Sequence, residues 1–232
     1  MNGAVKNITE GHWAVARHIV PFLIWVGLMS LPMRDVALRY AWQVVVSLVA
    51  FLLLKPWRYY PSINILSLPL GIMVGVGVAA IWILPETVWV QQFHGFHSTY
   101  SRFFIRGNDA GNGQLYAPEQ CGWILSIIRL GGSACVIAVI EEFFWRGFLM
   151  RWMVKSDFIS VDPLRITRLF LIISAVVFGL EHSRWFVGIV AGLAYGWLYC
   201  RKGDLVAVAV AHVTTNFLLG LYVLATGAYQ FW

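Results

Sequence analysis

Long apolar runs alternate with short polar segments along this chain. A helix needs about 20 apolar residues to cross about 30 Å of hydrocarbon, so the pattern predicts an all-α, polytopic transmembrane bundle of about seven spans, with six or eight as the limits. The apolar runs cover residues 14–33, 36–54, 66–84, 122–150, 169–180, 185–200 and 205–224.

The fifth and sixth runs are short, and only the sequence EHSR (181–184) separates them. This pattern predicts a helical hairpin over 169–200. Arg168 and His182 would lie ~21 Å apart along a helix, so the turn is expected inside the membrane, where irregular backbone needs protein or water around it. Glycines at four-residue steps, Gly188 and Gly192 among them, are expected to let the two helices pack closely.

The connection at 85–120 contains RGNDAGNGQLYAP (106–118), whose Gly, Asn and Asp content predicts a loop. His94 and His97 lie three residues apart in this connection, a spacing that could suit a metal. We interpret them instead as solvated side chains.

Composition supports the membrane interpretation. The chain has 232 residues, of which 59% are hydrophobic and 12% charged, whereas a soluble domain is near half apolar and a quarter charged. The net charge of +6 comes from Lys and Arg spaced singly or in pairs between apolar runs, as in membrane loops, so no nucleic-acid partner is expected. The three cysteines form no CxxC pair, which argues against a disulfide framework or a thiolate zinc site.

Several ionisable or amide side chains fall inside the apolar runs. Each costs a few kcal/mol to bury in a bilayer, so such residues mark functional sites. Counted at 1.5 Å per residue from the same side of the membrane, four of them, Glu141, His182, His212 and Asn216, fall at similar depths of about 12 to 21 Å. A shared internal site would explain this agreement. The full set is Glu141, Glu142, Arg146, Glu181, His182, His212 and Asn216.

Helical spacing assigns different partners to these side chains. Glu142 and Arg146 are four residues apart and are predicted to form an ion pair. Glu141 is rotated by about 100° from Glu142 and has no arginine at helical spacing. His212 and Asn216 are also four apart, which places two hydrogen-bond donors on one helix face.

A carboxylate without a cation, a histidine and two further donors favour hydrolysis. The carboxylate can take a proton from water, and the donors can hold a developing oxyanion. The chain contains no GxSxG, HExxH, CxxC or Walker-type loop, so the corresponding chemistries have no support.

Three motifs carry a resemblance to a known family. They read EEFFWR (141–146), FGLEH (178–182) and HVTTN (212–216), and they match the EExxxR, FxxxH and HxxxN motifs of the CAAX prenyl protease type II and bacteriocin-processing (CPBP or Abi) family. The resemblance covers about residues 122–224. It divides the chain into N-terminal spans with a long loop (1–121) and a catalytic membrane core (122–232).

The resemblance implies an intramembrane glutamic endopeptidase that needs no metal or other cofactor. Glu141 would activate water together with His182, and His212 and Asn216 would form the oxyanion hole. The supporting motif positions are Glu142, Arg146 and Phe178.

The expected partners are membrane lipids and a membrane-associated or lipidated protein substrate. The short loops and small size are typical of bacteria, which places the expected protein in a bacterial inner membrane. Its size and long loop also resemble the CAAX protease-related proteins of exosortase and PEP-CTERM sorting systems.

Three alternatives remain. A zinc protease could use Glu141, His182 and His212 as ligands with water in the fourth place, although Asn216 would then be idle and no second carboxylate is evident to orient His212. A membrane chaperone, immunity or scaffold protein could keep the fold without catalysis, but here all motif residues are present. A proton-coupled transporter is disfavoured because no inverted repeat is evident.

Overall fold

The computed structural model describes residues 2–61, 63–106 and 113–232, with side chains from residue 11 onward, and this part of the chain contains helices and no strands. All seven predicted segments are helical. Five helical stretches are long and apolar enough to cross a membrane, as expected for an integral, multi-pass membrane protein. They are Gly11–Met29, Val36–Tyr59, Ile65–Gln91, Pro118–Trp152 and Leu205–Thr226.

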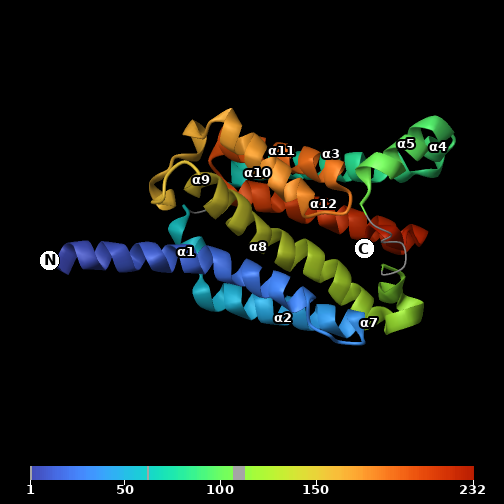
Figure 1. The fold of residues 1–232 in the computed structure, drawn as a ribbon, viewed down its shortest axis with the longest axis horizontal. Coiled ribbons are helices and arrows are strands. Elements are labelled where there is room, and N and C mark those ends of the chain that lie inside the picture. Colours follow the sequence, from blue (N-terminus) through green and yellow to red (C-terminus); the bar gives the residue numbers. More distant parts are fainter. Residues whose placement is uncertain (1, 62, 107–112) are drawn as a thin grey trace.

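The helices form two groups with one long span between them (Figure 1). The first group pairs α1 (Asn2–Met29) with α2 (Val36–Leu54). The second contains α3 (Leu68–Ile83), which packs along α12 (Leu205–Thr226). The span that begins with α7 (Pro118–Gly131) runs between the groups and contacts both. Glu141, Glu142 and Arg146 of this span are therefore buried between the groups, whereas Trp123, Ile124 and Ile127 near its start are exposed.

The predicted hairpin is present in the second group. Helices α10 (Arg168–Leu180) and α11 (Trp185–Lys202) pack tightly against each other. With 13 residues, α10 is only ~20 Å long, so it is too short to cross a bilayer, and α11 is also not among the five long apolar stretches. A Cβ added to Gly192 would lie 2.9 Å from the Cα of Ala175. The close approach of the two helices therefore depends on glycine.

Two π-helical turns interrupt the long central span, which the sequence pattern did not predict. After α7 come a π turn at Gly132–Ile137, the short α8 (Ala138–Glu142), a second π turn at Phe143–Leu149, and α9 (Met150–Trp152). Such turns inside α-helices are frequent at functional sites. Glu141 and Glu142 lie between the two turns.

The connection at 85–120 is more ordered than its composition suggests. It contains α4 (Val88–Gln91) and α5 (His94–Phe104), which extend beyond the bundle at one end (Figure 1). His94 is exposed on α5, and His97 is partly exposed. Residues 107–112 of the predicted loop lie outside the described residues.

Candidate active site

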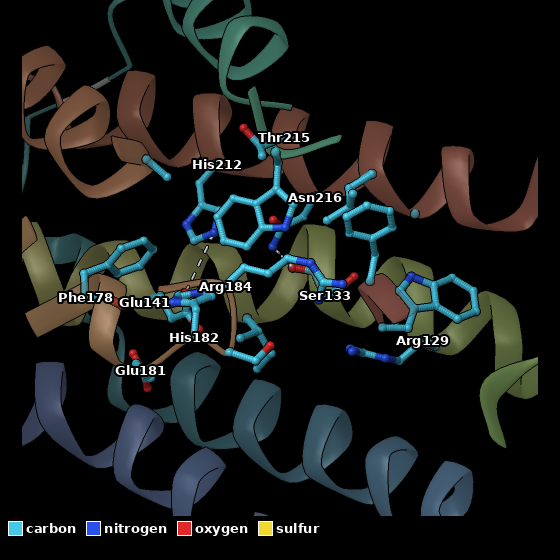
Figure 2. Close-up of a pocket in the computed structure, with 18 of the residues that line it drawn as sticks. Arg129, Ser133, Glu141, Phe178, Glu181, His182, Arg184, His212, Thr215 and Asn216 are labelled. Atoms are coloured by element: carbon cyan, nitrogen blue, oxygen red, sulfur yellow. Dashed lines mark hydrogen bonds and ion pairs between the residues drawn. The ribbon is translucent and has the colours of Figure 1, made fainter. Parts of the chain in front are cut away.

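Three separate elements direct polar side chains into one internal cavity of about 330 Å³ (Figure 2). Glu141 comes from α8, His182 from the turn after α10, and His212 and Asn216 from α12. The three elements are far apart in the sequence, so the meeting of these side chains is a property of the helix packing. The shared depth inferred from the sequence corresponds to a shared cavity.

Glu142 and Arg146 form the ion pair that their spacing predicts. Nη1 of Arg146 lies 2.9 Å from Oε1 of Glu142, and both side chains are fully buried. The other guanidinium nitrogen, Nη2, donates to the carbonyl oxygen of Gly192 at 3.1 Å, and the guanidinium stands 4.6 Å from the ring centre of Phe178. A buried charge needs a partner of this kind. The pair therefore ties the central span to the hairpin.

Glu142 also fixes the orientation of His212. The Nδ1 atom of His212 lies 2.8 Å from Oε1 of Glu142, and the ring of Tyr195 stacks on the imidazole at 4.9 Å. A carboxylate oxygen accepts, so Nδ1 is the donor and Nε2 is turned toward Glu141. The inference that no second carboxylate orients His212 was wrong. Glu142 does so from a helix that lies next to α12 only in the folded protein.

Glu141 faces the free side of that imidazole. Its Oε2 atom lies 3.8 Å from Nε2 of His212, which is too long for a direct hydrogen bond but close enough for the two groups to share a substrate atom or a water. Glu142 and Arg146 cancel each other's charge.

His182 is held at the turn of the hairpin. Its Nδ1 donates to the carbonyl oxygen of Phe178 at 2.8 Å, so in the neutral ring Nε2 is an acceptor. The rings of Phe178 and Trp82 flank the imidazole, with centroid distances of 4.7 and 5.5 Å. Packing on both sides leaves the ring little freedom. His182 therefore offers one acceptor nitrogen to the cavity that Glu141 also lines.

Asn216 is held by the first π turn. Its Nδ2 donates to the carbonyl oxygen of Ser133 at 2.9 Å (Figure 2). One N–H and the Oδ1 atom remain for other partners. The amide thus has a fixed position beside the cavity, with one donor hydrogen available for a bound group.

Sequence reasoning missed several residues around the cavity. Tyr195 positions His212 and also donates to Thr215 Oγ1 at 2.6 Å. Arg184 lies at the cavity wall, where its Nη2 is 2.8 Å from Glu86 Oε2 and its Nη1 donates to the carbonyl oxygen of Gln230. Of these residues, only Arg184 had a signal in the sequence, because it lies two residues after the FxxxH motif. The other contacts join distant segments.

The candidate zinc ligands meet only in part. Within 2–61, 63–106 and 113–232, no three His, Cys, Asp or Glu side chains are grouped closely enough to hold one metal ion. Glu141 and His212 approach each other, and His182 lines the same cavity.

The fold and this site define a class: a multi-pass integral membrane protein with a carboxylate–histidine centre inside its helical bundle. Comparison with protein families then gives a match over residues 123–218 to the type II CAAX prenyl endopeptidases described as Rce1-like. The matched segment contains all three motifs. Residues 123–218 are therefore similar to an Rce1-like type II CAAX prenyl endopeptidase domain, which places the chain among the hydrolases, more narrowly the proteases. No curated protein matches the chain, and no solved structure does.

Proposed function

We propose that the chain is an intramembrane glutamic endopeptidase. The observation that carries the proposal is the difference between two adjacent carboxylates. Glu142 is neutralised by Arg146 and bonded to His212, whereas Glu141 forms no ion pair with a Lys or Arg of the described residues and faces the cavity shared with His182. A carboxylate in that position is suited to act as a general base.

In the proposed reaction a water binds between Glu141 and the Nε2 atom of His182. Glu141 takes one proton from it, and the oxygen attacks the carbonyl carbon of the scissile peptide bond. The oxyanion accepts hydrogen bonds from Nε2–H of protonated His212 and from the remaining N–H of Asn216. As the C–N bond breaks, Glu141 gives its proton to the leaving amine. The carboxyl product and the amine product then depart, and the enzyme regains its starting charge.

The position of the cavity supports a membrane-associated substrate. Trp25, Trp82 and Phe178 line it together with the polar groups, and the elements around it belong to the helical bundle. We propose a membrane-associated or lipidated protein as the substrate, with membrane lipids as the surrounding partners and a bacterial inner membrane as the location. Within that range we favour the proteins of exosortase and PEP-CTERM sorting systems, because the size and the long 85–120 connection resemble the proteases associated with them.

One observation supports a zinc-dependent alternative. A carboxylate bonded to Nδ1 of a histidine whose Nε2 points into a cavity is the usual support for a metal-bound histidine, and Glu142 has this relation to His212. In that case Glu141, His182 and His212 would be the ligands, and the ion would lower the pKa of the attacking water. The metal content of the active enzyme separates the two mechanisms.

The test is proteolysis by the purified protein in detergent against a peptide library, read by mass spectrometry. We expect Glu141→Gln to abolish cleavage, whereas Glu119→Gln, an exposed glutamate near the start of α7, should retain it. The same preparations are analysed for zinc and assayed with a tight chelator. Cleavage that survives in Glu141→Gln would refute the proposed base. One zinc per chain, with activity lost on removal and restored on addition, would establish the alternative.

A further inference from the structure

Another charged side chain, that of Arg129, lies in the same cavity, on the side away from Glu141 (Figure 2). Arg129 belongs to α7, inside a membrane span. Because Arg129 lies near the end of the span, its side chain would be expected to extend to the membrane–water interface. Instead its guanidinium is 4.4 Å from the ring centre of Tyr40 and 4.9 Å from that of Tyr116.

The contact with the two rings leaves one hydrogen-bond donor of Arg129 unused. Its Nε atom is buried and has no hydrogen-bond partner. Within the described part of the chain, no Asp or Glu carboxylate lies within ion-pair distance of it. The buried Arg146 and Arg184 each have a glutamate. The buried Arg151 has none, but it donates to the carbonyl oxygens of Ile159 and Val161. A guanidinium inside a membrane protein normally pairs with an anion. Arg129 is therefore a cation held by two aromatic rings without an anion.

The cavity is consequently polarised along its length. Glu141 lies on one side of it and Arg129 on the other, with Ser133, Asn216 and Arg184 between them (Figure 2). A peptide lying across the cavity would meet a general base at one point and an unpaired cation at another. Arg presents several N–H donors in a fork that matches a carboxylate, and the rings of Tyr40 and Tyr116 hold the guanidinium from two sides.

We propose that Arg129 binds a carboxylate of the peptide substrate and thereby sets which bond reaches Glu141. This inference rests on the proposed function. Arg129 and Glu141 are at most ~18 Å apart along the helix at 1.5 Å per residue. An extended peptide covers 3.3–3.6 Å per residue, so the bound carboxylate lies roughly four to six residues from the scissile bond. It belongs either to an acidic side chain or to the end of the substrate chain. Arg129 is a specificity-determining residue and takes no part in the proton transfers.

Binding is tested without turnover in the inactive Glu141→Gln protein. The probes are four fluorescent Leu/Ala decapeptides that form two pairs. In the first pair, one peptide has a free C-terminal carboxylate and the other a C-terminal amide. In the second pair, both peptides are amides, and one carries an internal Glu where the other carries Gln. Anisotropy in detergent micelles gives Kd. We expect the carboxylate-bearing forms to bind about ten- to a hundredfold more tightly than their neutral counterparts, as for hydrogen bonds to charged groups. Adding Arg129→Gln should remove that difference, whereas Arg102→Gln should keep it. Arg102 is a suitable control because it also stands against an aromatic ring, that of Phe103, but on an exposed part of α5.

Cleavage by the otherwise unmodified enzyme supplies the second arm. Library peptides cleaved by it should carry an acidic residue or a free C-terminus four to six residues from the cut, and Arg129→Gln should lose this preference with a raised KM and a nearly unchanged kcat. Equal binding of charged and neutral peptides would overturn the role of Arg129, whether or not the enzyme cleaves. A second result would also overturn the role of Arg129. It is that phosphatidylglycerol alone stabilises the protein that retains Arg129 while no peptide is preferred, which would assign the cation to a lipid phosphate. Absence of cleavage together with the expected binding difference would reject the proposed function and keep the carboxylate site.

Discussion

Replacing Glu142 should unfold the protein more readily than replacing its neighbour Glu141. In Glu142→Gln the side chain keeps its shape but loses its charge, and Arg146 remains fully buried with the Gly192 carbonyl and two aromatic rings around it. Removing one partner of a buried ion pair costs about 3–5 kcal/mol. The amide oxygen can still accept one hydrogen bond, so we expect the lower end, about 3 kcal/mol.

For a chain of this size 1 kcal/mol corresponds to about 2–4 °C, so Tm should fall by roughly 6–12 °C. Glu141→Gln removes no buried counter-ion, and its free energy of unfolding should change by less than about 1 kcal/mol. Intrinsic tryptophan fluorescence in one detergent gives both melting curves. Both variants should lose proteolysis, because Glu142 also holds the Nδ1 atom of His212.

A double variant isolates the cause. Adding Arg146→Met to Glu142→Gln removes the unpaired cation, so a large part of the lost stability should return while proteolysis remains absent. Replacement of a buried pair by apolar groups is often neutral or stabilising. Equal melting temperatures for the two single variants would refute this account of the pair. A double variant less stable than Glu142→Gln would do so as well.

Three further predictions concern other parts of the site. Asn216→Ala should lower turnover by about 10²–10³-fold, the loss expected for one oxyanion donor, and an unchanged kcat would remove Asn216 from the mechanism. A cysteine placed at position 182 should react slowly with a small thiol reagent and resist a bulky impermeant one, because the cavity is internal; rapid labelling by the bulky reagent would contradict this. Gly192→Val should lower Tm, since any Cβ there meets Ala175, whereas Gly77→Ala on α3, where nothing lies within 4 Å, should leave it nearly unchanged.

The parts of this structure that depend on short sequence distances were predictable. Apolar runs of span length locate the helices, and the four-residue spacing of Glu142 and Arg146 predicts their ion pair, because both follow from helix geometry alone. The hairpin at 169–200 was likewise evident from the four residues that separate its helices.

Features that depend on how helices pack were not predictable in the same way. The contact of Glu142 with His212 joins residues seventy positions apart, and that of Asn216 with Ser133 joins residues eighty-three apart. Neither pair has a periodic relation in the sequence. The π turns also left no signal, since small and apolar residues dominate both of them, as in an ordinary span, and the one charged residue, Arg146, is explained by its ion pair. Helix α5 was missed because its mixture of polar and aromatic residues resembles a loop.

The first π turn determines where the central span tolerates the loss of a residue. A π turn, with i→i+5 hydrogen bonds, holds one residue more than the i→i+4 turn of an α-helix. An in-frame loss of one codon within 132–137 would therefore convert the π turn to an α turn and keep Glu141 and Glu142 directed at α12. The same loss within 123–131, where the helix is regular, would rotate that part of α7 against α8 by about 100°. Related genes that encode this centre are therefore expected to differ by one codon at the π turn rather than in the α-helical segment before it.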